Sequence, residues 1–230
     1  MIKYLLLLSI IILLVIIGSM GINETHISKP QYDLDEKGKM KIQDQCKFTG
    51  SGFNKDHELG ECSVALQIIP IVNNVLEIGG GTGKVSHMIN SILQKKCLGR
   101  KHIVMEPGSG GLGNHGDEHL CVNKDKFKDQ YTILKKFACE LTMKDLEILD
   151  DKPDCLYTDC EGCLLEFCQS NIGNHVLDNV RYIVNEMDGH VKNKQLDKKL
   201  REIWINKGFE KVATGYGCGI SCDTEIWKKI

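Results

Sequence analysis

The chain has 230 residues, of which 42% are hydrophobic and 26% are charged, and it contains only 4 prolines. This composition is typical of one globular domain and excludes collagen-like, low-complexity and coiled-coil proteins. The 31 acidic side chains nearly balance the 29 Lys and Arg side chains, so the chain lacks the basic field that a nucleic acid would need. We therefore expect no nucleic-acid partner.

Residues 1–22 form a strongly apolar segment. No charged side chain occurs over residues 4–22, a length close to the roughly 20 residues that span a bilayer as a helix. This pattern predicts a single-pass membrane anchor. A basic residue before the apolar stretch and small residues after it are also typical of a cleavable secretory signal, after which the protein would be secreted or lumenal. The sequence leaves both interpretations and the membrane orientation open.

Two further segments follow the apolar one. Residues 23–57 are polar without a sustained hydrophobic period, which predicts a loosely ordered lead-in or stalk. Residues 58–230 are expected to form the domain, because apolar patterns of helix and strand length alternate there. Helices are predicted at 58–72, directly after Gly83, at 161–170 and at 194–207, and strands at 74–78, 101–107, 131–134, 155–159 and 180–186.

The alternation of strands and helices predicts a doubly wound α/β fold with a mostly parallel sheet covered on both faces. Residues 209–227 are broken by glycines and predict two more strands, joined by a turn, that close the sheet edge. The expected sheet therefore has seven strands and a Rossmann-like arrangement.

Cysteine is frequent, with 11 residues in the chain. An oxidising compartment would favour disulfides, with Cys46–Cys62 and Cys218–Cys222 as candidates, whereas reduced thiols would be small buried hydrophobic side chains. The CxxC pair within residues 160–163 has neighbouring cysteines whose spacings fit no common zinc module. We interpret this run as packing residues at a strand end and along the following helix.

Acidic residues close four of the predicted strands. Ligands of open α/β sheets bind beyond the carboxyl ends of the strands, so residues at these ends are the first candidates for a site. A strand end must be polar, but acids at four such ends are more than coincidence would supply, and we interpret them as one site. They are Glu77, Glu106, Asp159 and Glu186.

The glycine-rich turn after the first strand restricts the ligand. A phosphate-binding P-loop would need glycine in place of Ile78 and Ser or Thr in place of Val85. A dinucleotide fingerprint would need glycine in place of Lys84. What remains is an ExGxGxG pattern over Glu77–Gly83, which indicates close backbone approach to a ligand and an acid that accepts from a cationic or zwitterionic group.

This turn, with Glu106 lying 23 residues beyond Gly83, resembles that of the class I S-adenosylmethionine-dependent methyltransferases. The resemblance implies that the turn and Glu77 hold the methionine end of S-adenosylmethionine, and that Glu106 accepts from the ribose hydroxyls. The cofactor-binding residues implied in this way are Glu77, Gly79, Gly81, Gly83 and Glu106.

Residues 74–227 resemble the FkbM-like branch of these enzymes more closely. The resemblance rests on Glu106-Pro107, residues 141–146, Asp159-Cys160-Glu161-Gly162 and Glu186. That branch typically carries Asp-x-Gly-Ala-Asn-x-Gly in its glycine turn, where this chain has Glu77, Gly80 and Gly81. The resemblance implies an O-methyltransferase that acts on a hydroxyl acceptor, such as a sugar or glycan.

Methyl transfer to a hydroxyl requires alignment of the acceptor and removal of its proton. By position we expect Asp159 and Glu161 to serve as the general base, with Glu186 and His190 as second candidates. Close carboxylates could also hold a divalent cation that activates the hydroxyl. Direct base catalysis is favoured over the cation, so no metal is predicted.

Two other functions remain open from the sequence. The chain could keep the fold and the pocket as a non-catalytic binding protein, or it could be an oxidoreductase that uses another nucleotide. Binding of S-adenosylhomocysteine, compared with binding of NAD, would distinguish these alternatives.

Overall fold

The computed structural model describes residues 32–47, 50, 58–96, 99–108, 116–150, 152–160, 162–187, 194–217 and 222–230. The predicted anchor or signal at 1–22 lies outside these residues, as do Glu161, His190 and Cys218. Within the described ranges, no helix combines the length and the apolar character that crossing a bilayer requires.

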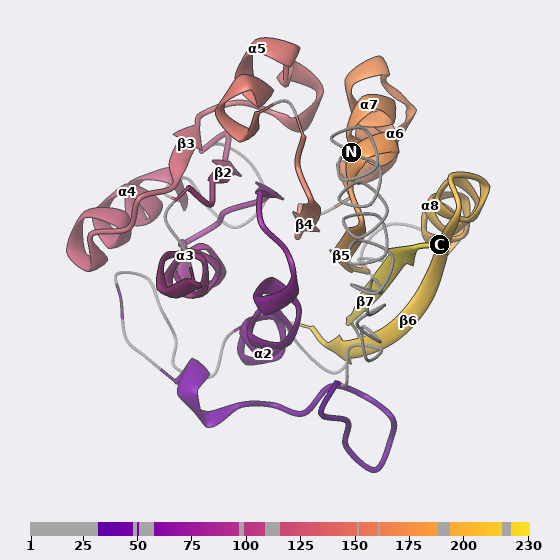
Figure 1. Ribbon diagram of the computed structural model, residues 1–230, viewed down its shortest axis with the longest axis horizontal. Helices are drawn as coiled ribbons and strands as arrows, with labels where there is room; N and C mark the ends of the chain where they lie inside the picture. Colours follow the sequence, from indigo (N-terminus) through magenta and orange to yellow (C-terminus); the bar gives the residue numbers. More distant parts are fainter. Residues whose placement is uncertain are drawn as a thin grey trace, which may run out of the picture. The chain divides into compact units, whose positions relative to one another are not determined.

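The described residues form one mixed sheet of seven strands in the order β3-β2-β1-β4-β5-β7-β6. The first five strands are parallel to one another, and β7 is antiparallel to both of its neighbours. Figure 1 shows this arrangement. The strands are β1 (Val75–Ile78), β2 (His102–Met105), β3 (Thr132–Leu134), β4 (Cys155–Thr158), β5 (Tyr182–Glu186), β6 (Phe209–Tyr216) and β7 (Asp223–Lys229).

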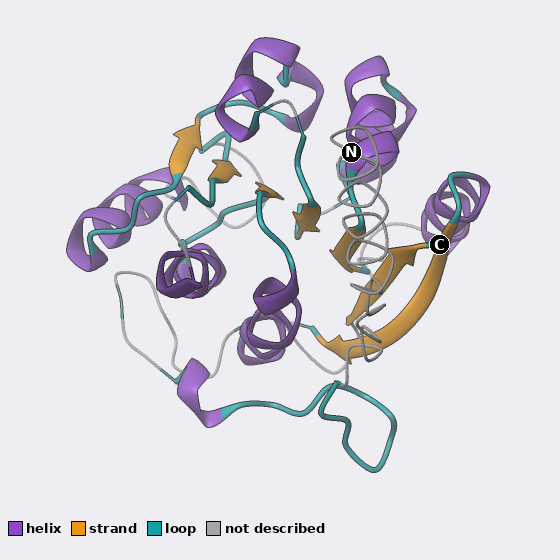
Figure 2. Ribbon diagram, in the orientation of Figure 1, coloured by secondary structure: helices purple, strands orange, loops and turns teal. Residues whose placement is uncertain are grey.

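Helices cover both faces of the sheet, as the predicted doubly wound fold requires (Figure 2). Buried side chains of α2 and α3 pack with Val75 and Tyr157 on one face, whereas α6, α7 and α8 pack with Leu76 and Ile183 on the other. The helices are α2 (Leu59–Ile68), α3 (Lys84–Lys96), α4 (Gly116–Phe127), α5 (Met143–Leu146), α6 (Leu164–Gln169), α7 (Asn171–Asn179) and α8 (Lys194–Asn206).

The C-terminal pair of strands closes one edge of the sheet, as expected. β7 lies between β5 and β6 and does not form the edge. Its central residues are buried, whereas β6 exposes Glu210 and Lys211. Charged side chains on an outermost strand discourage pairing with another chain, so β6 is the strand suited to the edge.

Two predicted helices also differ from the structure. The helix expected at 58–72 ends at Ile68 and continues as a 3-10 turn that contains Pro70, which cannot continue a helix without loss of a hydrogen bond. The helix expected at 161–170 is followed directly by the unpredicted α7. Ser170 separates the two with an extended backbone, and its hydroxyl caps α7 by accepting from the Gly173 N–H at 3.0 Å.

Part of the predicted lead-in packs on the domain. Met40 and Cys46 are fully buried in the cluster that contains α2, and the Met40 N–H donates to the Thr214 carbonyl of β6 at 2.9 Å. The candidate Cys46–Cys62 disulfide is absent. Both are buried free thiols, and the Cys46 Sγ lies 3.5 Å from the Ser63 hydroxyl.

The CxxC pair, expected to consist of packing residues, instead forms a disulfide between Cys160 and Cys163. The two cysteines are three positions apart in the segment between β4 and α6, and their Cα atoms are 5.5 Å apart. This distance is within the usual range for a disulfide. Their neighbours Cys155 and Cys168 are buried thiols of the core, as the sequence predicted.

Candidate functional site

The glycine turn joins β1 to α3 and lies against the end of β4. Gly79 has φ +92°, and a Cβ atom there would be 1.7 Å from the Asp159 carbonyl oxygen. Only glycine permits both this conformation and this approach. Gly81 also has a positive φ, +48°, but a Cβ there would meet no atom within 4 Å. The backbone at Gly81 therefore faces open space, where a ligand can approach closely.

The far side of the turn is fixed by α4. A Cβ at Gly83, where φ is +84°, would be 2.7 Å from a methyl carbon of Leu120. The Asn123 side-chain amide donates to the Thr82 carbonyl at 2.8 Å. The turn is thus held between β4 and α4, and its backbone is preorganised.

Glu77 lies beneath the turn and not beside its open side. Its side chain is only 2% exposed. One carboxylate oxygen accepts from the Ser86 hydroxyl of α3 at 2.7 Å, and the other accepts from His102 Nε2 of β2 at 2.7 Å. Both oxygens that were predicted to hold a ligand therefore already have partners within the chain. Glu77 instead fastens β1 to α3 and β2 and positions the turn.

Glu106 contacts the glycine turn directly. Its carboxylate accepts from the Gly81 N–H at 2.8 Å and from the Gly108 N–H at 3.1 Å. The side chain is half-buried and follows directly after β2. An acid in this position can accept hydrogen bonds from hydroxyl groups of a ligand that lies on the turn.

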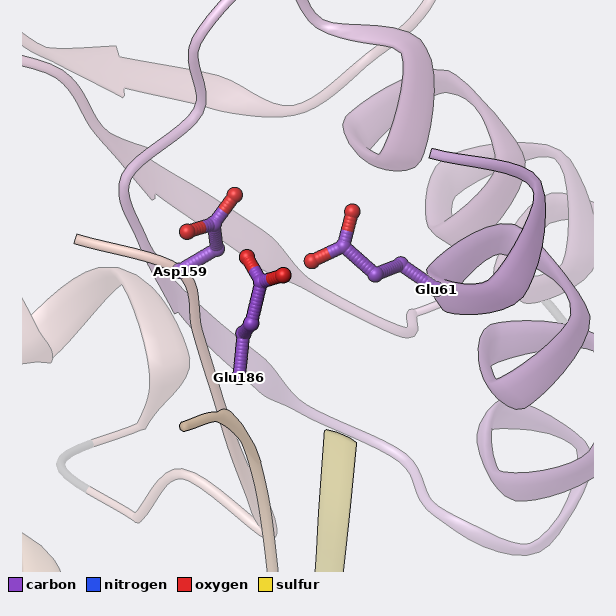
Figure 3. A group of neighbouring side chains, drawn as sticks. All are labelled: Glu61, Asp159 and Glu186. Carbon is purple, nitrogen blue, oxygen red and sulfur yellow. The ribbon is translucent and has the colours of Figure 1, made fainter. Parts of the chain in front are cut away.

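Three carboxylates meet beyond the ends of β4 and β5. Asp159 follows β4 directly, Glu186 is the last residue of β5, and Glu61 comes from the first turn of α2. One oxygen from each side chain lies within 4.8 Å of the others, and Figure 3 shows the three groups pointing toward one another. The structure thus brings together the predicted Asp159 and Glu186. We call this group the three-carboxylate cluster.

Sequence reasoning missed Glu61, because the pattern of residues 58–72 indicated only a packing helix. The signal available in the sequence was an acid between uncharged residues, Gly60, Cys62, Ser63 and Val64. In the structure these four neighbours are all buried. The helix start is fixed by tight contacts. The Tyr157 hydroxyl donates to the Glu61 carbonyl at 2.7 Å, and a Cβ at Gly60 would be 2.1 Å from the Tyr216 carbonyl.

The electrostatics of the cluster are unusual at Glu61. The residue is 1% exposed, and no N–H or O–H group of the described residues donates to either of its carboxylate oxygens. Burial first, and then the Asp159 and Glu186 carboxylates, raise the pKa of Glu61 well above its usual range. The arrangement can hold a proton or a cation, and its oxygen donors are of the kind that Mg²⁺ and Ca²⁺ prefer.

No protein-family model matches the chain, and no curated protein matches its sequence. Solved structures do match its fold. The ribosomal protein L11 methylase of Lactobacillus delbrueckii subsp. bulgaricus is 10% identical, with a TM-score of 0.51 over 80% of this chain and 81% of that chain. A Klebsiella pneumoniae protein assigned as an O-methyltransferase is 15% identical, with a TM-score of 0.50 over 74% of this chain and 79% of that chain.

These similarities, together with the strand order, show that the chain has the Rossmann-like α/β fold of the class I S-adenosylmethionine-dependent methyltransferases. At 10% and 15% identity the likeness concerns the fold. What the protein does must therefore be argued from its site.

Proposed function

We propose that this protein is an S-adenosylmethionine-dependent O-methyltransferase of the FkbM-like branch. The observation that carries the proposal is the pairing of Glu106 with the Gly81 N–H at the open side of the glycine turn. In this fold that turn lies at the carboxyl ends of the parallel strands, where ligands bind. We propose that the methionine end of the cofactor lies at the open backbone of Gly81 and that Glu106 accepts from its ribose hydroxyls; the open space at Gly81 and the Glu106 contact with its N–H support this.

The proposed acceptor is a hydroxyl group, with a sugar or glycan as the class that the sequence resemblance implies. The bound cofactor supplies a methyl group already activated on a sulfonium, so the protein must align the acceptor and take its proton. As the bond between carbon and acceptor oxygen forms and the bond between carbon and sulfur breaks, the hydroxyl proton passes to a carboxylate. Asp159 is our candidate for that base, because its backbone touches the glycine turn at Gly79.

We further propose that residues 1–22 place this activity at a membrane. The support is their apolar sequence alone. A glycosylation reporter fused to the C-terminus of the full chain tests this proposal and reports the orientation. A protein that fractionates without membranes and keeps residues 1–22 would contradict it.

Cofactor binding is the first test of the function. We expect S-adenosylhomocysteine to raise the melting temperature of the full-length protein in a concentration-dependent manner, and NAD to leave it unchanged. Stabilisation by NAD alone would identify a nucleotide-dependent oxidoreductase and overturn the proposal.

Methyl transfer is the second test. S-adenosylmethionine labelled in its methyl group is incubated with the protein and a panel of oligosaccharides, lipids and proteins. One of these acceptors should gain a labelled methyl ether at a hydroxyl group. Asp159→Asn should lower kcat/KM at least 100-fold, the order of magnitude that a general base contributes, while stabilisation by S-adenosylhomocysteine persists. The matched control is Glu210→Gln on the exposed edge of β6. Binding without transfer to any acceptor would favour a non-catalytic binding protein.

A further inference from the structure

We propose that Glu61, Asp159 and Glu186 bind one divalent metal cation, and that this cation binds the acceptor oxygen during transfer. The second part rests on the proposed methyltransferase function, whereas the first part stands on the cluster alone. The assignment replaces the sequence expectation of a metal-free site. It also gives a role to Glu61, which direct base catalysis does not use.

The spacing of the three groups fits one ion. A cation with oxygen ligands at about 2.3–2.6 Å, as for Ca²⁺, can hold two ligands up to about 5 Å apart, and Mg²⁺ at about 2.1 Å can hold them about 4 Å apart. The three carboxylates offer oxygens within 4.8 Å of one another. Three oxygens at that limit would lie about 2.8 Å from their common centre, so a Ca²⁺-sized ion binds all three after a small inward movement of the side chains, and Mg²⁺ after a larger one.

The burial of Glu61 provides an independent reason for a cation. Its carboxylate is removed from solvent, and no N–H or O–H donor of the described residues reaches it. Buried charges in proteins are paired or coordinate metals, because an isolated buried carboxylate is strongly unfavourable. Figure 3 shows that this side chain extends from α2 toward Asp159 and Glu186. Its oxygens thus point into the space that a shared cation would occupy.

The backbone around the cluster is built to hold this arrangement. The start of α2 is fixed by the Tyr157 hydroxyl and by the close approach of Gly60 to β6. A Cβ at Gly217 would be 2.7 Å from a carboxylate oxygen of Glu186, so only a glycine there leaves room for that group. Ligands supplied by fixed helix and strand ends are preorganised, which favours binding of an ion.

The chemistry favours a divalent metal ion over the ammonium group of an amine acceptor. Carboxylates are hard oxygen ligands, and three of them leave coordination positions of Mg²⁺, Mn²⁺ or Ca²⁺ open for water and acceptor oxygens. A hydroxyl bound to such a cation loses its proton more easily. The proton then passes to solvent as the oxygen attacks the methyl group and the bond between carbon and sulfur breaks, so that with the cation bound Asp159 acts as its ligand and not as the base. Because Asp159 touches Gly79, that oxygen would lie beside the glycine turn.

Mn²⁺ is the probe for this site, because bound Mn²⁺ can be counted by the loss of its free electron paramagnetic resonance signal. We expect the full-length protein, freed of metal with EDTA, to bind one Mn²⁺ per chain, and Mg²⁺ or Ca²⁺ to compete. Glu61→Gln and Asp159→Asn should each weaken Mn²⁺ binding at least tenfold, whereas Glu210→Gln should not. Thermal melts without metal show whether each variant is folded.

Several outcomes would overturn the cation site. Absence of Mn²⁺ binding would do so, as would tight binding that folded Glu61→Gln leaves unchanged. Stabilisation by methylammonium in the absence of any Mn²⁺ binding would instead identify an amine-binding site. S-adenosylhomocysteine is measured in parallel. Binding of S-adenosylhomocysteine without Mn²⁺ removes the cation and leaves the proposed function, whereas Mn²⁺ binding without S-adenosylhomocysteine removes the function and leaves the cation site.

Discussion

The acidic side chains of the site lie in two regions, which differ in the hydrogen-bond donors that the chain provides to the carboxylates. At the glycine turn, the Glu77 carboxylate accepts from Ser86 and His102, and the Glu106 carboxylate accepts from backbone N–H groups. In the three-carboxylate cluster, the described residues provide no such donor to Glu61. The turn follows β1 and Glu106 follows β2, whereas Asp159 and Glu186 of the cluster lie at the carboxyl ends of β4 and β5 in the same parallel part of the sheet.

The difference separates the two acids of the turn, which accept hydrogen bonds within the folded chain, from Glu61, to which no described N–H or O–H group donates. A buried carboxylate with two donors is satisfied in the folded chain and costs little. A buried carboxylate without donors costs stability, unless something from outside the chain compensates it. The comparison therefore predicts that substitutions at the turn act mainly on stability and cofactor binding, whereas substitutions in the cluster act on cation binding and transfer.

Gly79→Ala should have the largest effect on stability. The new Cβ would overlap the Asp159 carbonyl, and the positive φ adds conformational strain. We expect the free energy of unfolding to fall by roughly 3–5 kcal/mol. The matched control is Gly81→Ala, which also has a positive φ but no atom near its Cβ, so it should lose only about 1–2 kcal/mol. Urea denaturation measures both. Equal losses would show that contact with β4 does not hold the turn.

Ser86→Ala should have the next largest effect. It removes the hydroxyl that donates to Glu77 in a fully buried position, so one carboxylate oxygen loses its donor. We expect a loss of about 2 kcal/mol in the free energy of unfolding. Ser91→Ala on the same helix is the control, because that half-buried hydroxyl donates only to the Met88 carbonyl one turn earlier. If Ser86→Ala is no more destabilising than Ser91→Ala, the Glu77 contact is not structural.

The raised pKa of Glu61 should be visible in the pH dependence of stability. Its pKa is raised well above the usual range, first by burial and then by the neighbouring carboxylates. Between the usual Glu pKa and the raised one, the folded chain binds one more proton than the unfolded chain, so stability falls as pH rises. In metal-free buffer, wild type should lose about 1.4 kcal/mol per pH unit relative to Glu61→Gln in that window. Parallel pH profiles of the two proteins would contradict this prediction.

The sequence predicted the sheet well, because its signals are local. Each parallel strand is an apolar run bounded by polar residues or glycine, and the five runs occur in the structure as β1 to β5. The insertion of β7 between β5 and β6 could not be predicted, since the order of antiparallel partners depends on contacts between distant segments. The break at Ser170 was a local capping signal that helical periodicity concealed.

The site was predictable where topology alone determines it. Asp159 and Glu186 end neighbouring parallel strands, so their meeting follows from the strand order. The participation of Glu61 depends on how α2 packs against β6 through Gly60, which no local pattern reports. The burial of Glu77 could have been suspected from His102, a polar residue that begins an otherwise apolar strand.

Glu106→Gln should have the smallest effect, and it separates the two regions most directly. The Gln oxygen can still accept from the Gly81 N–H, so the turn should remain folded, but the negative charge that strengthens hydrogen bonds from the ribose hydroxyls is lost. We expect the affinity for S-adenosylhomocysteine to fall about tenfold, equivalent to about 1.4 kcal/mol, in isothermal titration calorimetry. Glu210→Gln should leave the affinity unchanged.

The same variant should bind Mn²⁺ as tightly as wild type, because Glu106 is not one of the three residues of the cluster. Glu61→Gln should show the reverse pattern, with weaker Mn²⁺ binding and nearly unchanged affinity for S-adenosylhomocysteine. Each substitution replaces one carboxylate by its amide, so opposite patterns cannot result from a general loss of charge. If instead both variants weaken both ligands equally, the acids act as one electrostatic unit, and the division between the glycine turn and the three-carboxylate cluster is wrong.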